Sequence, residues 1–342
     1  MSYPTSIKAV GINETGGIEV IQNLEVPFPE VKPTDLLVKV EWAGVNFVDT
    51  YHRSGLYPSR QRPLPIATEV SGIILELPSD PSILESSDFK NRGFKKGGRV
   101  AIHLPGLLQE YVAVNWNTTA YAVPDKISTR VAAAALLQGL TTLAQVTESY
   151  HVDNGDTVLI HTVAGGVGLL HAQVAKARGA TIIGTTSTTE KAELAKTHGA
   201  DHVILYKQEN TVERVLELTD GEGVNVIYDG VGRATFDDDL KMIKRKGTIV
   251  SFGNASGQVE PVDLLKLAKK NVKLLRPTLA NYLVTAEERN HYSAELWRLV
   301  SGGALRINIH AEYPFTDEGV RQAHIDLTTG KTTGKLLIKV AE

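Results

Sequence analysis

The chain has 342 residues, and at roughly 100–200 residues per domain this length predicts two domains. It carries 36 Lys and Arg against 39 Asp and Glu, and the resulting net charge of −3 argues against a protein devoted to nucleic acid. The absence of cysteine excludes disulfides, thiol nucleophiles, iron–sulfur clusters and zinc sites built on thiolate. No segment approaches the roughly 20 apolar residues of a membrane helix, so we expect a soluble, cytoplasmic protein with no membrane partner.

The first third of the chain has the pattern of a β-rich domain. Short runs of Val, Ile and Leu are separated by Pro and Gly, which favours an antiparallel or barrel-like domain with long loops. The polar segment Ser79–Lys96 is predicted to be an exposed loop insertion. The predicted strands are Ile7–Gly11, Leu36–Trp42, Val70–Glu76, Arg99–Leu104 and Glu110–Val114.

Strands and helices alternate in the middle of the chain, after an Ala- and Leu-rich helical stretch at Thr129–Tyr150. Alternation with helices of about ten residues predicts βαβ units and a parallel sheet. The predicted strands are Thr157–His161, Thr181–Thr185, Val203–Leu205, Val224–Tyr228 and Gly247–Phe252, and the helices between them are Gly168–Arg178, Glu190–Thr197, Thr211–Leu218 and Thr235–Lys241.

The last part of the chain returns to the texture of the first. A predicted helix at Ala286–Val300 leads to short strands at Ile307–Ala311 and Lys335–Val340. We therefore predict an α/β nucleotide-binding domain at residues 128–276, inserted into a β-rich domain formed by residues 1–127 and 277–342.

The turn after the first strand of the α/β array carries part of a dinucleotide-binding fingerprint. Gly165 and Gly168 take the second and third glycine positions of G-x-G-x-x-G, while Val163 stands at the first. The second glycine lets the backbone approach a pyrophosphate, and the third lets the helix pack closely on the strand. A tight turn without a ligand is the alternative, and the strand before and helix after it argue against that. The predicted pyrophosphate-binding residues, at a helix N-terminus, are Ala164, Gly165, Gly166, Val167 and Gly168.

The end of the second strand favours NADPH over NADH. An NAD enzyme usually places Asp or Glu there to bind the ribose 2′-hydroxyl. Here a run of hydroxyl residues that includes Thr186 and Ser187 leaves room for a 2′-phosphate, and the first acid is Glu190 on the next helix. Lys191 can pair with that phosphate as a point charge; the alternative is an exposed first-turn lysine.

Two glycine-containing turns follow the fourth and fifth strands, where the ligand crevice of an open α/β sheet lies. They are Asp229–Gly232 and Ser251–Ser256, and their backbone is predicted to frame the nicotinamide. The residues concerned are Val231, Gly232, Phe252, Gly253 and Asn254.

The segment Asn46-Phe-Val-Asp-Thr-Tyr-His-Arg-Ser-Gly-Leu-Tyr57 resembles the signature loop of the NADPH:quinone oxidoreductases, the zeta-crystallin-like branch of the medium-chain dehydrogenase/reductases. Ala164–Gly168, Asp229–Gly232, Ser251–Asn254 and Leu275–Leu279 are similar in content and order. The resemblance covers essentially the whole chain. It implies a GroES-like catalytic domain interrupted by a Rossmann doubly wound parallel-sheet domain, an active site in the cleft between domains, and a homodimer or tetramer joined through the nucleotide domain.

The resemblance also implies roles for single residues. At the nicotinamide and quinone end of the site it places Asn46, Asp49 and Tyr51, with Tyr57 as a wall of the quinone pocket. The residues implied to contact NADPH are Thr141 near the nicotinamide, Lys191, Tyr206 and Lys331 near the adenosine 2′-phosphate, and Asn254 and Arg276 elsewhere.

We expect no metal. Alcohol dehydrogenases of the same superfamily bind catalytic zinc through Cys and a His that precedes a Glu, but here Thr68 precedes Glu69, and Glu69 is interpreted as structural. A quinone is strongly electrophilic, so the protein mainly has to hold nicotinamide and quinone in contact. The acidic run Asp237–Asp239 is interpreted as satisfying a helix dipole rather than binding a cation.

Three hypotheses of function follow from the sequence. The first is an NADPH-dependent quinone reductase, and the second is an NADPH-dependent reductase of α,β-unsaturated carbonyls with hydride delivered to carbon. The third is a binding protein, because relatives of zeta-crystallin are reported to bind AU-rich RNA or to serve as bulk lens protein. The net charge and the lack of an RNA-binding motif count against nucleic acid as the main partner.

Overall fold

The computed structural model describes residues 3–58 and 62–341. The chain divides into two compact units: unit 1 comprises residues 1–137 and 289–342, and unit 2 comprises residues 138–288. The two boundaries between the units fall inside helices α4 (Thr129–Ala144) and α11 (Ala286–Ser301). Both helices begin where the sequence pattern changes. The division into a catalytic domain at residues 1–127 and 277–342 and an NADPH-binding domain at residues 128–276 stays a prediction.

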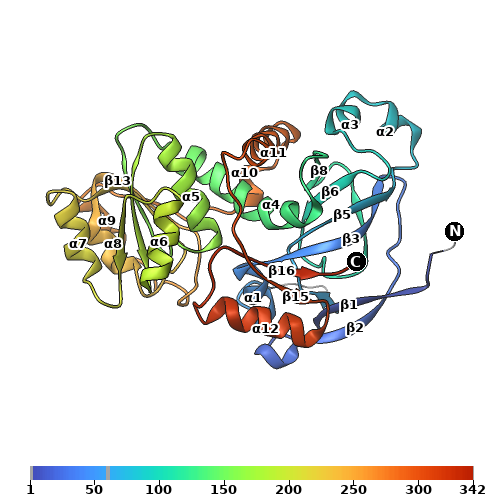
Figure 1. Cartoon of the computed structure of the whole chain (residues 1–342), viewed down its shortest axis with the longest axis horizontal. Helices are drawn as coiled ribbons and strands as arrows, with labels where there is room; N and C mark the ends of the chain where they lie inside the picture. Colours follow the sequence, from blue (N-terminus) through green and yellow to red (C-terminus); the bar gives the residue numbers. More distant parts are fainter. Residues whose placement is uncertain (1–2, 59–61, 342) are drawn as a thin grey trace. The chain divides into compact units, whose positions relative to one another are not determined.

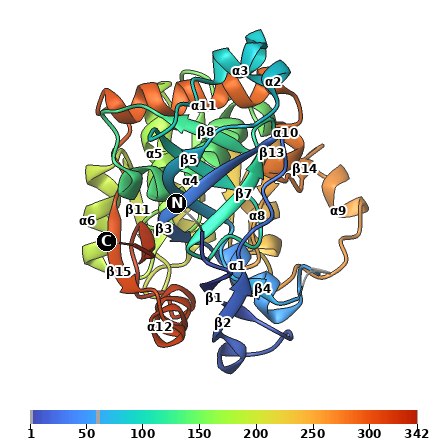
Figure 2. The same ribbon diagram turned by 90° about the vertical axis from the view of Figure 1, so that its right-hand side faces the viewer.

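Unit 1 is built on a large, mainly antiparallel sheet with a smaller sheet beside it. The large sheet has the order β15-β16-β3-β5-β6-β8. Strand β7 pairs with β3 (Figure 2). The small sheet has the order β2-β1-β4. The strands are β1 (Ser6–Ile12), β2 (Gln22–Pro27), β3 (Asp35–Val45), β4 (Leu64–Pro65), β5 (Glu69–Glu76), β6 (Arg99–His103), β7 (Tyr111–Asn115), β8 (Ala120–Val123), β15 (Ile309–Pro314) and β16 (Lys335–Lys339). All five strands predicted in the first third are confirmed.

The structure corrects the prediction of an exposed loop at Ser79–Lys96. Two short helices form there, α2 (Pro81–Glu85) and α3 (Ser87–Arg92), because the side chains of Asp80 and Ser86 accept hydrogen bonds from the first turns. Phe89 is buried and packs edge-on against Trp116, with ring centroids 5.3 Å apart. Phe89 attaches the segment to the core of unit 1, and the mostly polar sequence around it gave no sign of this contact.

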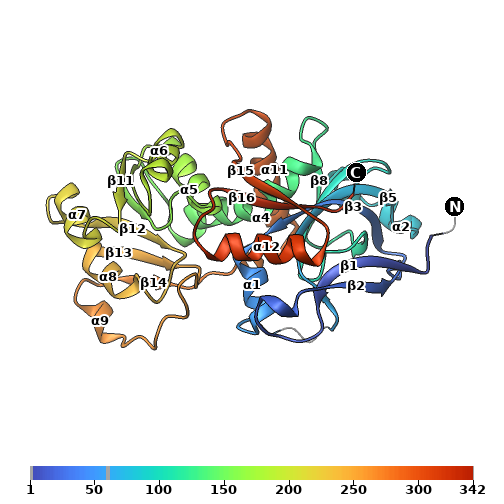
Figure 3. The same ribbon diagram turned by 60° about the horizontal axis from the view of Figure 1, so that its bottom comes forward.

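Two further helices of unit 1 were not predicted. Helix α1 (Phe47–Ser54) lies inside the segment that resembles the family signature, and α12 (Asp317–Thr328) lies along β15 and β16 (Figure 3). The side chain of Thr316 accepts a hydrogen bond from the backbone N–H of Gly319 and so caps α12. Helix α12 buries Val320 and Ala323 in the same core as Leu336 and Ile338 of β16.

Unit 2 is a doubly wound parallel sheet with the order β11-β10-β9-β12-β13-β14, the strand order of a dinucleotide-binding fold. Helices α5 and α6 lie on one face and α7 and α8 on the other (Figure 1). The strands are β9 (Thr157–Ile160), β10 (Thr181–Thr186), β11 (His202–Leu205), β12 (Val224–Asp229), β13 (Ile243–Ser251) and β14 (Lys273–Leu275). The helices are α5 (Gly166–Ala177), α6 (Thr189–Thr197), α7 (Thr211–Leu218), α8 (Phe236–Met242), α9 (Leu265–Ala268) and α10 (Leu279–Tyr282), with a π-helical turn at Gln145–Ser149.

The core of unit 2 takes apolar residues from five of its strands, among them Leu159, Ile183, Ile204, Ile227 and Ile249. Parallel sheets covered on both faces need such residues, which is why the strands read as apolar runs in the sequence. The fold class predicted from the sequence is confirmed. Within the described residues, every helix is too short or too polar to cross a membrane.

Candidate functional site

The turn between β9 and α5 shows why its glycines are needed. Gly165 is the N-cap of α5 and donates its backbone N–H to the Thr162 carbonyl at 2.8 Å. A Cβ at Gly168 would lie 2.6 Å from the Thr162 oxygen and 2.8 Å from the Val163 Cα, so only glycine lets the helix start this close to the strand. No side chain caps α5, and its first N–H groups therefore remain available to an anion. The residues Ala164, Gly165, Gly166, Val167 and Gly168 all lie in this turn and the first helical turn.

The end of β10 places hydroxyl groups beside two lysines. Thr188 caps α6 by accepting the backbone N–H of Lys191 at 3.4 Å. Burial lowers the pKa of Lys191, and the positive charge of Lys207 lowers it further. A lysine whose pKa is lowered by a neighbouring positive charge favours an anion beside it. Lys207 was missed by the sequence analysis, although it directly follows Tyr206, a predicted contact.

Tyr206 lies just after β11, the strand that pairs with β10. Its side chain is 48% exposed, which leaves an aromatic face open to a planar ring. Thr186 and Ser187 lie at the end of β10 in the same part of the sheet. Unit 2 therefore brings together four of the residues predicted to recognise the adenosine end of the cofactor: Thr186, Ser187, Lys191 and Tyr206.

The turns after β12 and β13 lie against each other. A Cβ at Gly253 would lie 2.3 Å from the Gly230 carbonyl oxygen, and Gly232 has a φ of +89°, so both positions require glycine. Arg276 donates to the carbonyl oxygens of Ser251 at 2.9 Å and Gly253 at 3.1 Å. The amide oxygen of Asn254 accepts from Arg276 Nη2 at 2.8 Å. Val231, Gly232, Phe252, Gly253, Asn254 and Arg276 thus form one local cluster, in which Arg276 holds the second turn in place.

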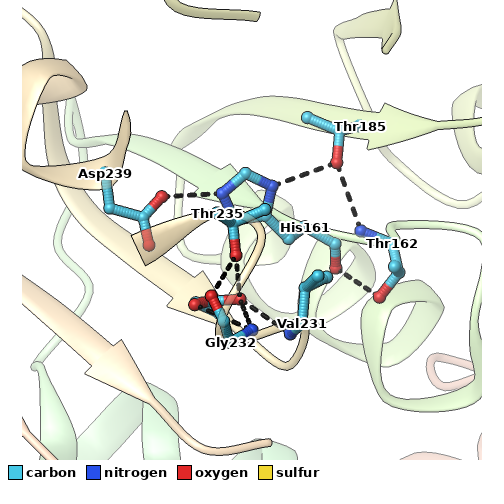
Figure 4. A network of polar contacts seen from close by, with 8 residues as sticks. His161, Thr162, Thr185, Val231, Gly232, Thr235 and Asp239 are labelled. Atoms are coloured by element: carbon cyan, nitrogen blue, oxygen red, sulfur yellow. Dashed lines mark hydrogen bonds and ion pairs between the residues drawn. The ribbon is translucent and has the colours of Figure 1, made fainter. Parts of the chain in front are cut away.

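A buried polar network, missed by the sequence analysis, lies behind these turns (Figure 4). His161 Nε2 is 2.8 Å from Asp239 Oδ1, and His161 Nδ1 is 3.2 Å from Thr185 Oγ1. Asp237, Asp238 and Asp239 lie in the first turn of α8, where acids were expected, but Asp239 is in addition 0% exposed and paired with His161. Helical spacing turns this one acid of the three towards the sheet.

In unit 1, helix α1 carries the residues predicted for the nicotinamide and quinone end. Asp49 accepts the backbone N–H of Asn46 at 2.8 Å and the hydroxyl of Thr68. Burial raises the pKa of Asp49 to about 7, against the opposing effect of these hydrogen bonds. Tyr51 and Tyr57 meet edge to face with ring centroids 5.2 Å apart. The structure therefore groups Asn46, Asp49, Tyr51 and Tyr57 at one helix.

The amide of Asn46 is held from both ends. Its Nδ2 donates to Glu69 Oε1 at 3.0 Å and to the Gly44 carbonyl at 3.2 Å, and its Oδ1 accepts from Lys335 Nζ at 2.6 Å. Lys335 and Glu69 also pair with each other. The interpretation of Glu69 as structural agrees with these contacts. Nothing in the local sequence marked Lys335, because its partners lie far away in the chain.

The two remaining predicted residues lie apart from these clusters in the sequence. Thr141 is half-buried on α4, in the part of that helix that belongs to unit 2. Lys331 is exposed in the connection between α12 and β16 of unit 1. Across residues 3–58 and 62–341, no three His, Asp or Glu side chains come together in a group that could hold a metal ion.

Comparison with known proteins agrees with this geometry. Residues 32–125 match the model of the alcohol dehydrogenase GroES-like domain, and residues 166–301 match that of zinc-binding dehydrogenase. A quinone oxidoreductase of Pseudomonas aeruginosa is 38% identical over 94% of this chain and 96% of its own. Quinone oxidoreductase 1 of Escherichia coli is 36% identical over 96% of this chain and 98% of its own.

Solved structures give the same result. The structure of Escherichia coli quinone oxidoreductase complexed with NADPH matches with a TM-score of 0.89 at 35% identity, covering 97% of this chain and 99% of that one. A 2-haloacrylate reductase matches with a TM-score of 0.79 at 30% identity, covering 97% of this chain and 99% of that one. The resemblance found in the sequence motifs is confirmed.

Proposed function

This chain belongs to the quinone oxidoreductase family of the medium-chain dehydrogenase/reductase superfamily, and we propose that it reduces quinones with NADPH and without a metal ion. The observation that carries the proposal is the set of residues at and around the end of β10. Hydroxyl residues stand where an NAD enzyme carries an acid, and Lys191 on α6 and Lys207 after β11 add positive charge. The structure of the Escherichia coli relative, which is 35% identical and holds NADPH, supports the same cofactor.

The residues of unit 2 fit NADPH. The free N–H groups in the first turn of α5 would bind the pyrophosphate. Lys191 with Lys207, Thr186 and Ser187 would bind the 2′-phosphate. The turns after β12 and β13, the second of which is held by Arg276, are proposed to frame the nicotinamide. Thr141 is proposed as a further contact of the nicotinamide, and Lys331 as a further contact of the adenosine end. When bound, NADPH supplies the reducing equivalents, as a hydride or as electrons. These site assignments are part of the proposal.

The residues of unit 1 orient the substrate. Tyr51 and Tyr57 offer aromatic faces and hydroxyl groups to a flat, polar-edged ring such as a quinone. Hydrogen bonds to Glu69 and Lys335 fix the side chain of Asn46, and a hydrogen bond from Thr68 fixes that of Asp49, at the proposed nicotinamide and quinone end. The site needs no strong acid, because a reduced quinone oxyanion is delocalised. Thr68, which stands where the zinc-binding dehydrogenases carry a ligand His, is a poor zinc ligand.

A second candidate is reduction of a carbon–carbon double bond conjugated to a carbonyl or carboxyl group. The observation that favours it is the match to 2-haloacrylate reductase, which is 29% identical over 97% of this chain. Both reactions place a flat unsaturated acceptor against the nicotinamide, so the same fold serves either. The RNA-binding hypothesis stays a prediction.

We also propose a homodimer formed through unit 2. Strand β14 lies at the edge of its sheet, and three large apolar side chains near it in sequence are strongly exposed: Leu264 (73%), Leu265 (75%) and Val284 (64%). Exposed apolar side chains next to an open strand edge favour pairing with a second copy.

We propose that the protein acts in the cytoplasm, which cell fractionation with an antibody to the chain tests.

The experiment that tests the function follows NADPH oxidation by absorbance with a small para- or ortho-quinone, with an enone, and with 2-chloroacrylate, each repeated with NADH. Turnover of the quinone with NADPH and much slower turnover with NADH is the expected result. Turnover of the enone or the haloacrylate alone would move the chemistry to carbon. NADPH binding without turnover of any acceptor would contradict the enzymatic proposal.

A further inference from the structure

His161 connects two loops that the proposed function assigns to the cofactor. Its backbone N–H donates to the Tyr228 carbonyl of β12 at 3.1 Å, and its ring contacts β10 and α8. The side chain is 3% exposed, and that of its partner Asp239 is 0% exposed. A histidine ring that is buried and bonded on both sides has one fixed orientation.

On one side, the network leads to the turn at which we place the pyrophosphate. Thr185 Oγ1 contacts His161 Nδ1 and accepts the backbone N–H of Thr162 at 3.3 Å, while the Thr185 carbonyl accepts the N–H of Val163 at 3.0 Å. Thr162 has a φ of +54°, a conformation that costs energy for a branched residue. The contacts of Thr185 hold this strained residue, and His161 holds Thr185.

On the other side, the network leads to the turn after β12. Asp229 accepts the backbone N–H groups of Val231 at 2.7 Å and Gly232 at 3.1 Å, and the hydroxyl of Thr235 at 3.0 Å (Figure 4). The negative charge of Asp229 raises the pKa of Asp239. Asp239 Oδ2 is buried and has no hydrogen-bond partner among the described residues unless a proton lies between the two acids.

The charges in this cluster are balanced by His161. Burial lowers the pKa of His161, but the carboxylates of Asp239, Asp229 and Asp238 outweigh burial and raise it above its ordinary value. Burial also raises the pKa of Asp239 to about 6, opposed by His161 and reinforced by Asp229. Loss of the imidazolium charge therefore leaves excess negative charge directly behind a turn that has to accept phosphate.

We propose that His161, Asp239 and Asp229 form a positioning network that fixes the pyrophosphate turn and the Gly230–Gly232 turn to each other, and that the net charge of this network sets the affinity for NADPH. The inference rests on the proposed function, because it takes NADPH as the ligand. By linkage, NADPH binding takes up protons at the cluster, and affinity falls as the pH rises through the titration of His161.

The test is the dissociation constant of NADPH, followed by nucleotide fluorescence between pH 6 and pH 9, for the full-length protein and its variants. We expect His161→Gln to weaken NADPH binding roughly three- to tenfold at neutral pH, through an uncompensated charge near the phosphates, and to flatten the pH dependence. In that background, Asp239→Asn removes the excess negative charge and should restore most of the affinity. If His161→Gln acts only by disturbing the packing, the affinity for NADPH should instead decrease further in the double variant.

His324→Gln is the matched control, because His324 is also buried but lies on α12 of unit 1, outside the network. It should keep the affinity and pH profile of the wild type. If His161→Gln fails to fold, calorimetry of the wild type in two buffers of different ionisation enthalpy measures proton uptake on NADPH binding directly. Absence of uptake, or an unchanged pH profile in a folded His161→Gln, overturns the inference. Failure of the wild type to bind NADPH at any pH would instead contradict the proposed function.

Discussion

Lys335 on β16 and Glu69 on β5 form a buried ion pair, although 266 positions of the sequence separate them. The side chain of Lys335 is 3% exposed and that of Glu69 is 0% exposed. Glu69 Oε2 also accepts the backbone N–H of Leu137 at 2.7 Å, and both side chains bind the amide of Asn46. The orientation of the Asn46 amide, at the proposed substrate end, therefore depends on this pair.

The first prediction concerns the stability that the pair confers. Lys335→Met leaves the Glu69 carboxylate buried without its cation, and we expect a loss of roughly 3–5 kcal/mol in the free energy of unfolding. Lys339→Met, on the exposed end of the same strand, should change it by less than about 0.5 kcal/mol. Urea unfolding of both variants measures the difference. Equal free energies of unfolding for Lys335→Met and Lys339→Met would show that the buried ion pair does not stabilise the fold.

The second prediction concerns the choice between NADPH and NADH. Lys191→Ala removes a cation from the proposed 2′-phosphate site, and NADPH binding should weaken about tenfold while NADH binding stays nearly unchanged. Lys207→Ala should have the same direction and a smaller size. Lys196→Ala on the same helix, whose lysine pairs with Glu193, is the control and should alter neither constant. Equal weakening of both nucleotides by Lys191→Ala would rule out its phosphate role.

The third prediction concerns Asp49 and pH. The pKa of Asp49 is raised to about 7 in the folded protein, against 3.8 for an ordinary aspartate, so the native state binds more protons than the unfolded state between these values. Its contribution to the free energy of unfolding therefore falls as the pH rises from about 4 to about 7. Asp49→Asn should remove this slope. Thr68→Val removes a hydrogen bond that lowers this pKa, and it should extend the slope to higher pH.

Chemical unfolding at several pH values measures these slopes for the wild type and both variants. The comparison uses the slope and not the absolute stability, because Asp49→Asn also loses one of the hydrogen bonds that the carboxylate accepts. A slope in Asp49→Asn equal to that of the wild type would assign the titration to another group.

The fourth prediction concerns assembly. Leu265→Asp places a charge among the exposed apolar side chains near β14, and it should shift the protein from a dimer towards a monomer of 37.1 kDa. Leu84→Asp changes an exposed leucine of unit 1 and should leave the dimer intact. Light scattering after size-exclusion chromatography gives both masses. A wild-type monomer, or a Leu265→Asp dimer, would contradict the proposed interface.

Local patterns in the sequence were sufficient for much of the fold. The strands of unit 2 are apolar runs because both faces of a parallel sheet are covered, and the strands of the first third stand between prolines and glycines. The hydrophobic pattern of the sequence did not predict helices α1, α2, α3 and α12. These helices are short or strongly polar, and they are held by caps and by a few buried anchors such as Phe89 and Val320. A cap has a weak signature, and an anchor is recognised only once its neighbours are known.

The sequence by itself determined the βαβ order, the glycines at 165 and 168, and the hydroxyl run after β10, because each depends on backbone geometry and on residues close together in the chain. Only the tertiary structure decided the partners of the buried charges. Lys335 with Glu69 and His161 with Asp239 each join different elements, and the pattern of one segment carries no record of the other. The physical reason is that a buried charge has to find its counter-charge wherever the fold places one, so its role is set by three-dimensional proximity and not by spacing in the chain.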